Sequence, residues 1–176
     1  MEKKTILDMG RDTLEEYRLR KKIPLVVVLD NIRSLNNIGS VFRTSDAFRV
    51  EQIVLCGITA TPPSVEIHKT ALGAEDSVDW NYCPDTLRAV ADLQKRGYHV
   101  SALELVKGAV SLEEFKVSPA GRYAIVVGHE VNGVDQKVVD ICDSCIEIPQ
   151  EGTKHSLNVA VSTALAIWQF YLALRR

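Results

Sequence analysis

The chain lacks an excess of charge of either sign, internal repeats and low-complexity runs. Its 176 residues carry 21 Lys and Arg against 23 Asp and Glu, which gives a formal net charge of −2. This balance argues against a strongly basic nucleic-acid coat but allows a local basic patch that binds phosphates. With 46% hydrophobic and 25% charged residues, neither a disordered nor a collagen-like chain is indicated. The length fits one domain that buries roughly 70% of its unfolded surface.

Cysteine is scarce, with four in the whole chain. Cys142 and Cys145 have C-x-x-C spacing, but no second such pair and no paired histidines complete a zinc set. Free cysteine commonly packs as a small hydrophobe. We therefore expect reduced structural thiols, a cytoplasmic protein and no metal.

Segments that target or cross a membrane are also missing. The stretch MEKKTILDMGRDTLEEY has no apolar core, so no signal peptide is predicted. Residues 159–174 approach the ~20 apolar residues that a membrane-spanning helix needs, but Ser162, Thr163 and Gln169 interrupt them. This helix is predicted to be buried in protein rather than in a membrane.

Short apolar runs rich in Val and Ile recur along the chain, with helical patterns between them. Because the runs are continuous rather than alternating, they indicate strands covered on both faces, as in a parallel sheet between helices. The predicted fold class is α/β. Residues 1–23 are predicted to form a separate helical extension, and 24–176 the main domain. The expected strands are 24–30, 52–57, 99–105, 122–128 and 144–149, with the clearest helix at 84–97.

Three of the predicted strands run into polar loops. Ligands of open α/β sheets lie beyond the carboxyl ends of the strands, so we expect the chemistry of this protein there. The chain contains neither G-x-G-x-x-G nor G-x-x-x-x-G-K-[ST]. The sequence therefore does not predict a standard dinucleotide-binding loop or P-loop. The three loops are LDNIRSLNNIGS, GHEVNGV and IPQEGTKHSLN.

The first loop leads into a helix whose apolar residues share one face, so that Arg43 points away from them together with Asn36 and Gly39. Two readings of Arg43 are open. It pairs with Asp46 three residues later, or it faces an anion at the start of the helix together with an Asn side chain.

The third loop precedes the apolar helix at 159–174. Ser156 or Asn158 can cap this helix. Capping needs only one of these two residues. The presence of both, next to Lys154 and His155, indicates that the loop binds a ligand.

In order and spacing, the three loops resemble the motifs of the SpoU (TrmH-like) branch of the SPOUT RNA 2'-O-ribose methyltransferases. Those motifs are Asn-x-Gly-x-x-x-Arg with a following Ala-Phe, then Gly-x-Glu-x-x-Gly, then Ile-Pro, Gly and Ser-Leu-Asn-Val with a later Ser. The matching residues are Asn37, Gly39, Arg43, Ala47, Phe48, Gly128, Glu130, Gly133, Ile148, Pro149, Gly152, Ser156, Leu157, Asn158, Val159 and Ser162.

The resemblance covers roughly residues 24–172. Two positions depart from the family pattern: Arg49 stands where Gly is usual, and Gln169 where many members have Glu. Neither lies among the polar residues of the motifs.

The resemblance implies a SPOUT-type parallel sheet flanked by helices, with a deep trefoil knot in its C-terminal part. Knots are nearly absent among proteins, and sequence physics alone would not propose one. The resemblance also implies a homodimer that binds S-adenosylmethionine in the knot and methylates a ribose 2'-OH of RNA. A tRNA is favoured over rRNA, with a D-loop guanosine as the finer expectation. The terminal helix would then pack partly against the partner subunit.

Residue roles follow from the same resemblance. Arg43 is the catalytic residue, Asn37, Ser156 and Asn158 orient it and the ribose, and Glu130 holds the loops together. Because a guanidinium is always charged, two roles of Arg43 are open: general base, or a clamp on the substrate phosphate. Backbone groups hold the cofactor near Leu103, Gly128, Ile148, Ser156 and Leu157.

Two competing functions are a non-catalytic knotted relative that binds RNA, and a base-modifying SPOUT enzyme that uses Asp76, Asp79 or His155. RNA contacts are expected from two basic clusters. One cluster lies at the end of the N-terminal helix. Its alternative explanation is a solvated helix end, where cations are favourably placed near the helix C-terminus. The clusters are Arg18, Arg20, Lys21 and Lys22, and Arg33, Arg43 and Arg49.

Overall fold

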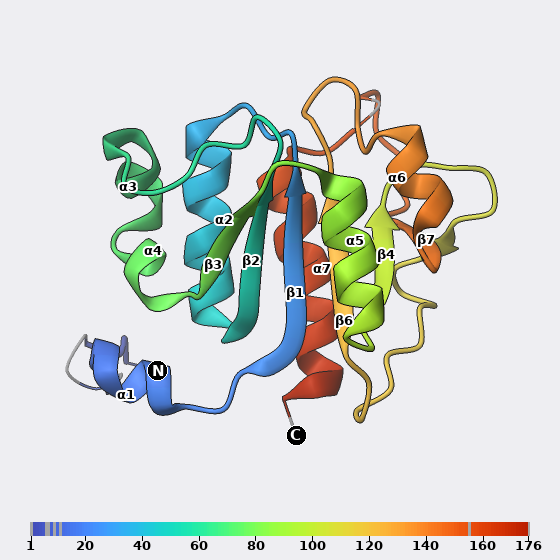
Figure 1. Ribbon diagram of the computed structural model, residues 1–176. Helices are drawn as coiled ribbons and strands as arrows, with labels where there is room; N and C mark the ends of the chain where they lie inside the picture. The colour runs from blue at the N-terminus through green and yellow to red at the C-terminus, as the bar shows by residue number, and fades with distance from the viewer. Residues whose placement is uncertain (1, 6–7, 9, 11, 155, 176) are drawn as a thin grey trace.

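A seven-stranded parallel sheet with helices on both faces forms the protein (Figure 1). The computed structural model describes residues 2–5, 8, 10, 12–154 and 156–175. The strand order is β3-β2-β1-β6-β4-β7-β5, and every neighbouring pair is parallel. The predicted parallel α/β fold is confirmed. The strands are β1 Ile23–Asp30, β2 Val50–Cys56, β3 Trp80–Cys83, β4 His99–Leu103, β5 Val110–Ser111, β6 Tyr123–Val127 and β7 Ser144–Glu147.

Seven helices occur in the described ranges. The two that matter most for the site begin where the sequence predicts a polar entry: Ser34 caps the first of them, and Asn158 caps the last. The helices are α1 Leu14–Leu19, α2 Leu35–Ala47, α3 Val65–Ala71, α4 Ala74–Ser77, α5 Thr86–Lys95, α6 Gln136–Ile141 and α7 Val159–Leu174.

Two strands and two short helices were not predicted. β3 reads WNYC and is nowhere fully buried, and β5 has two residues. Both lie at the edges of the sheet, where a strand needs no continuous apolar run. α3 and α4 span seven and four residues, which is too short for a clear helical period.

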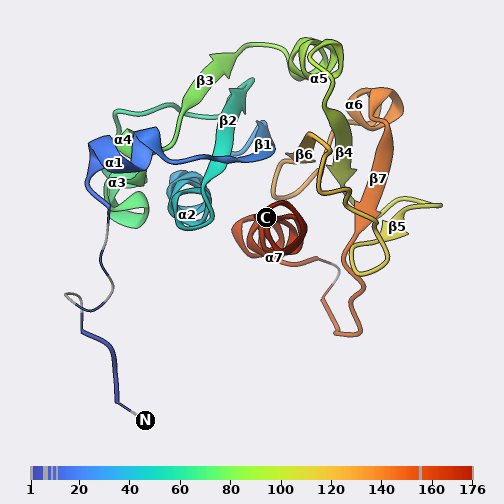
Figure 2. The ribbon, with the colours of Figure 1, turned by 90° about the horizontal axis from the view of Figure 1, so that it is seen from below.

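Alternate residues of β1 supply the two halves of the core. Val27 and Leu29 join the cluster beneath α2 and α7, whereas Val26 and Val28 join the cluster beneath α5. Figure 2 shows the corresponding layers, with α2 and α7 on one face of the sheet and α5 and α6 on the other. The sheet is therefore covered on both faces, as its continuous apolar strands require.

The terminal helix α7 covers its predicted span but is buried along one face only. Ala166, Ile167 and Phe170 are fully buried. The opposite side carries Val161, Leu165, Trp168 and Leu172, which are between 36% and 49% exposed. None of the helices in the described part of the chain has the length and apolarity that crossing a membrane requires.

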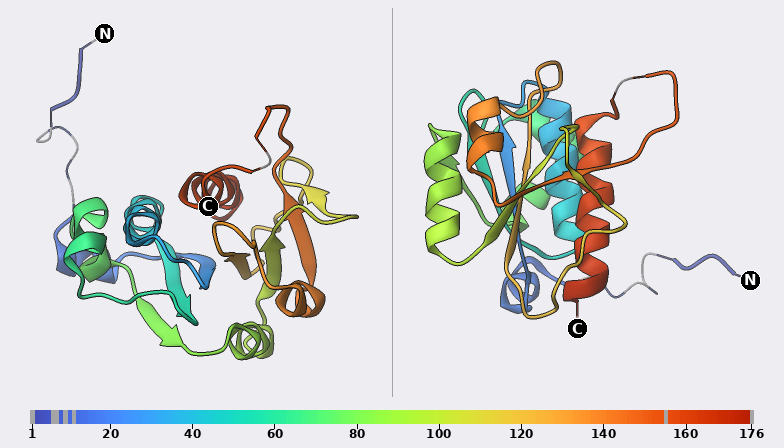
Figure 3. Two further views of the ribbon diagram at one scale, coloured as in Figure 1. Left: turned by 90° about the horizontal axis from the view of Figure 1, so that it is seen from above. Right: turned by 90° about the vertical axis from the view of Figure 1, so that its right-hand side faces the viewer.

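The carboxyl ends of β1, β4, β6 and β7 meet at one edge of the sheet, at the top of Figure 1. The three polar loops follow these strands. Figure 3 shows the connection after β7 arching away from the sheet before the chain returns to begin α7 at the same edge. This edge therefore gathers the motifs that the sequence analysis singled out.

Candidate functional site

Glu130, in the loop after β6, contacts the start of α2. Its Oε1 accepts hydrogen bonds from the backbone N–H of Ser34 at 2.9 Å and from Asn37 Nδ2 at 3.1 Å, and its Oε2 accepts one from the Arg33 N–H at 3.1 Å. Partial burial raises the pKa of the Glu130 carboxyl, but these hydrogen bonds outweigh it and hold the pKa below its usual value. Glu130 is thus an ionised link between two loops.

Asn158 adds the third loop to this cluster. Its Nδ2 donates to Asn37 Oδ1 at 3.1 Å, and its Oδ1 accepts from the Ala160 N–H at 2.9 Å. One side chain thereby caps α7 and contacts α2. Glu130, Asn37 and Asn158 form one continuous chain of hydrogen bonds across the three motif loops.

A cavity of about 540 Å³ lies between the ends of β4, β6 and β7 and the start of α7. This volume is typical of a small-molecule site. Glu130 and Asn158 line it, together with the apolar side chains of Val127 and Val159. All five residues predicted to bind the cofactor line it as well: Leu103, Gly128, Ile148, Ser156 and Leu157.

Two glycines allow close backbone contacts around the site. A Cβ on Gly128 would collide with the backbone of Gly133 and Val134, so the loop after β6 can turn tightly against its own strand end. A Cβ on Gly39 would collide with the carbonyl of Ile67, so α2 and α3 can pack closely. Both positions exclude larger residues for steric reasons.

Arg43 lies on the exposed side of α2 and does not line the cavity. Within the described ranges it makes no ion pair and no side-chain hydrogen bond. Asp46 Oδ1 instead accepts a hydrogen bond from Ser77 Oγ at 2.5 Å. The reading in which Arg43 pairs with Asp46 is therefore wrong, because Asp46 faces α4.

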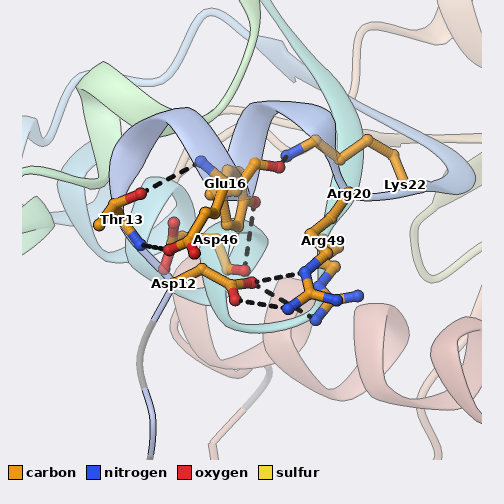
Figure 4. Close-up of polar contacts among 8 residues, drawn as sticks. Asp12, Thr13, Glu16, Arg20, Lys22, Asp46 and Arg49 are labelled. Carbon is orange, nitrogen blue, oxygen red and sulfur yellow. Dashed lines mark hydrogen bonds and ion pairs between the residues drawn. The ribbon is translucent and has the colours of Figure 1, made fainter.

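The basic residues that end α1 largely contact their own chain. Figure 4 shows two arginines directed at Asp12, which pairs with Arg20 at 2.8 Å and with Arg49 at 3.7 Å. Both oxygens of Asp12 accept from Arg20, which is a two-pronged contact. The hydrogen bond to Arg20 is the main reason that the pKa of Asp12 is lowered.

Two further cations of this cluster are also engaged. Lys22 Nζ donates to the Tyr17 carbonyl at 3.1 Å and lies over the Tyr17 ring. Arg18 donates to the backbone carbonyl of Asp76 at 3.0 Å. Lys21 is exposed and has no polar partner in the part of the chain that the structure describes. Much of the positive charge predicted for RNA contact is therefore compensated internally.

The second predicted basic cluster is not one patch. Arg33 precedes α2, Arg43 lies within it and Arg49 follows it. A helix of 13 residues is about 20 Å long at a rise of 1.5 Å per residue. Arg33 and Arg49 thus lie near opposite ends of α2, and sequence proximity did not place them together.

The residues considered for base modification lie elsewhere. Asp76, in α4, lines a separate hollow with Trp80, and Asp79 precedes β3. Neither lines the cavity beside Glu130. His155 lies outside the described residues.

The four cysteines are unbonded. Burial raises the pKa of the Cys56 and Cys142 thiols to about 12, which keeps both protonated and poorly nucleophilic. Among the described residues, no group of three or more His, Cys, Asp or Glu side chains is arranged to hold a metal ion.

The sequence analysis missed several polar residues of the cavity, among them Glu104 and His129. Both stand next to residues that it did assign, Leu103 at the end of β4 and Glu130 after β6. Their position directly after a strand is the signal that could have found them.

The fold and the site define a class of protein: a parallel α/β domain with a ligand cavity at the strand ends and a Glu–Asn–Asn hydrogen-bond chain at its rim. A sequence model of the SpoU rRNA Methylase family matches residues 24–168. The chain belongs to this family.

Individual relatives are distant. The 23S rRNA (guanosine-2'-O-)-methyltransferase RlmB of Vibrio vulnificus is 25% identical over 92% of this chain and 64% of its own. The A. aeolicus TrmH/SpoU tRNA modifying enzyme superposes with a TM-score of 0.80 at 26% identity, covering 91% of this chain and 80% of that one. The AdoMet-bound rRNA methyltransferase of Sinorhizobium meliloti shares the fold, with a TM-score of 0.79 at 24% identity over 90% of this chain and 60% of that one. The chain thus spans 64% of the length of the Vibrio relative.

Proposed function

We propose that this protein transfers a methyl group from S-adenosylmethionine to a ribose 2'-OH of RNA. One observation carries the proposal. Glu130 and Asn158, which lie at the two ends of the hydrogen-bond chain, line the same cavity as the five residues expected to hold the cofactor. Methyl donor and ribose-orienting side chains would therefore meet at one point, within a family whose relatives are named as RNA methyltransferases.

The cavity suits S-adenosylmethionine in size and in the character of its walls. Strand ends and loops supply backbone donors and acceptors near Gly128, Ile148 and Ser156, while Leu103 and Leu157 offer apolar contact to the adenine. The bound sulfonium supplies an already activated methyl group. The main service of the protein is then to position the 2'-OH in line with it.

We propose that Arg43 is a clamp rather than the proton acceptor. A guanidinium is a permanent cation in proteins and a poor proton acceptor, and Arg43 is exposed without a partner in the described ranges. It can therefore bind a substrate phosphate in a forked contact and stabilise the developing alkoxide. A phosphate oxygen or a water takes the proton. Asn37, Ser156 and Asn158 orient the ribose.

The proposed substrate is tRNA, with a D-loop guanosine as the finer assignment. The A. aeolicus neighbour is named as a tRNA modifying enzyme. The Vibrio relative, however, is named for 23S rRNA, so rRNA is the competing substrate. Basic side chains at the two ends of α2 and at the end of α1 are the proposed RNA contacts, with Lys21 the most available of those on α1.

We further propose a homodimer formed through α7. Val161, Leu165, Trp168 and Leu172 recur at intervals of four, three and four residues, so they form one exposed apolar stripe along the helix. A stripe of this kind marks a protein interface. Leu165→Glu should yield particles of 19.5 kDa in light scattering, with Lys137→Glu on α6 as the control. An unchanged dimer would place the interface elsewhere.

Four finer assignments belong to the same proposal. Residues 24–176 form a SPOUT domain whose C-terminal part is threaded in a deep trefoil knot, and residues 1–23 are a separate extension. The protein acts in the cytoplasm, and the transfer needs no metal.

One experiment separates the candidate functions. Purified protein is incubated with unmodified tRNA and with rRNA fragments in the presence of labelled S-adenosylmethionine, and the RNA is digested and analysed by mass spectrometry. Ribose-methylated nucleotides in one RNA support the proposal and identify the substrate. Methylated bases would favour the base-modifying alternative. Binding of RNA without methyl transfer would favour the non-catalytic relative.

A further inference from the structure

His129 makes an unusual set of contacts in the turn after β6. Its Nδ1 accepts hydrogen bonds from the backbone N–H of Val131 at 3.0 Å and of Asn132 at 3.2 Å. Its own carbonyl accepts from the Gly133 N–H at 2.8 Å. The imidazole therefore satisfies two N–H groups on the inside of an exposed turn, where Val131 is 82% exposed.

These contacts indicate the tautomer of His129. A ring nitrogen that accepts from two N–H groups carries no proton, so the proton of the neutral imidazole is on Nε2. A doubly protonated imidazole donates from both nitrogens and cannot accept. Protonation of Nδ1 would therefore break both hydrogen bonds and place the Nδ1–H group opposite the backbone N–H groups of Val131 and Asn132.

Two other sets of hydrogen bonds hold the same turn against neighbouring elements of the cavity wall. Glu104 Oε2 accepts from the Val134 N–H at 2.8 Å, and Glu130 contacts the start of α2. Gly133 has φ +69° and packs against the Glu104 carboxylate. His129 adds hydrogen bonds within the turn, between the contacts of Glu104 and those of Glu130, and we call this pair of hydrogen bonds the brace. The cavity is lined by Glu104, His129, Glu130 and Gly133.

We propose that His129 is a positioning residue for cofactor binding, and that its neutral Nε2–H form preorganises the turn at 129–133 as a wall of the cavity. The proposal rests on the proposed function only in naming S-adenosylmethionine as the ligand. Without the brace, binding must order an exposed turn, and that ordering lowers affinity. Loss of two neutral hydrogen bonds predicts a weakening of about tenfold.

The brace can be removed and then restored by substitution. His129→Ala removes the acceptor. His129→Asn keeps one, because an Asn side-chain oxygen accepts from backbone N–H groups two and three residues later in an Asx turn. By calorimetry at about pH 8, S-adenosylmethionine should bind His129→Ala about tenfold more weakly than the wild type, and His129→Asn within about twofold. Equal affinity of all three proteins would overturn the proposal.

Acid should weaken cofactor binding only in proteins that retain His129. The charged side chains that line the cavity around the turn are Glu104 after β4, Glu130 in the turn and Glu147 at the end of β7. His129→Asn keeps all of them. As the pH is lowered, affinity should fall in the wild type and stay flat in His129→Asn, because only the wild type carries the imidazole whose Nδ1 must remain unprotonated. His68→Asn, in the separate hollow beside Trp80, should behave as the wild type. A parallel fall in His129→Asn would contradict the proposal.

A measurement on the ligand-free protein separates this inference from the proposed function. Long-range ¹H–¹⁵N spectra report which imidazole nitrogen carries the proton, and hydrogen exchange reports the Val131 and Asn132 amides. An Nε2–H tautomer, with both amides exchanging faster in His129→Ala, supports the brace even if S-adenosylmethionine does not bind. An Nδ1–H tautomer overturns it even if methyl transfer is confirmed.

Discussion

The two ends of α2 handle charge in different ways. At its start, the Glu130 carboxylate accepts from backbone N–H groups and from Asn37, and Arg33 takes part through its backbone. At its end, the side chain of Arg49 lies 3.7 Å from Asp12, which also holds Arg20. A carboxylate thus organises loops at one end and neutralises cations at the other. Arg43, between the two ends, has neither kind of partner within the described residues.

This difference indicates that the charge at the start of α2 serves the cavity, whereas the ion pairs at its end only compensate each other. Exposed ion pairs contribute little to stability, so Asp12 and its arginines do not by themselves hold α1 in place. Tyr17 does more: it is 8% exposed, and its hydroxyl donates to the Asp46 carbonyl at 3.2 Å. The hydrogen bonds at the start of α2 hold loops around a cavity. Loss of one hydrogen-bond partner there should therefore weaken ligand binding.

The largest effect is expected at the unpaired arginine. Arg43→Ala should abolish methyl transfer and leave the affinity for S-adenosylmethionine nearly intact, because Arg43 does not line the cavity. Single-turnover rates and calorimetry on the same preparation measure the two quantities. Arg43→Lys keeps the charge but loses the forked contact, so a near-normal rate in this variant would contradict the clamp.

A smaller effect is expected at Glu130. Glu130→Gln keeps one acceptor oxygen but turns an NH₂ group toward the backbone donors that the carboxylate now satisfies. Unsatisfied donors cost about 1–3 kcal/mol, so the transfer rate should fall by roughly tenfold to a hundredfold. Glu113→Gln, at an exposed position, is the matched control. Full activity of Glu130→Gln would mean that the loops are held by other contacts.

The pH dependence of stability sharpens the same comparison. The pKa of Glu130 is lowered in the folded protein from its ordinary value of 4.5. Its contribution to stability is therefore complete above that value and is lost as the pH falls through the lower folded value. In urea titrations from pH 7 down to about pH 3, the wild type should lose more stability than Glu130→Gln. Parallel curves for the two proteins would rule out an ionised, stabilising Glu130.

The smallest effect is expected at the end of α1. Replacing Arg20, Lys21 and Lys22 together with Ala should change the salt dependence of RNA binding by no more than about one phosphate contact, a slope of roughly 0.7–0.9. Arg20 and Lys22 already have partners in the chain, which leaves Lys21 as the available cation. Filter binding over a range of salt concentrations measures the slope. A loss near three contacts would mean that RNA displaces Asp12 and Tyr17.

A counterpart variant tests the compensation directly. Asp12→Ala frees Arg20 and Arg49 without adding a positive side chain, so RNA affinity at low salt should rise slightly if this end of α2 faces the substrate. No change would assign the ion pairs to the structure of the extension alone.

Local patterns in the sequence predicted the longer helices and the more apolar strands, and they placed the residues expected at the cofactor around one edge of the sheet. The apolar run from Val159 to Leu174 predicted α7 at both ends. Five strands were found from their short apolar runs, and the central ones, β1 and β6, are buried on both faces. The residues expected at the cofactor line one cavity because each ends or closely follows a strand or precedes a helix, and strand ends of a parallel sheet share an edge.

Contacts between distant residues were decided by the tertiary structure alone. Asn37 and Asn158 meet across 121 residues, Asp46 turns to Ser77 rather than to Arg43, and Asp12 compensates two arginines that sequence reasoning had assigned to RNA. A side chain with several possible partners takes the one that packing brings within hydrogen-bonding distance. Spacing along the chain determines which face of a helix a residue occupies, and the fold determines what lies opposite that face.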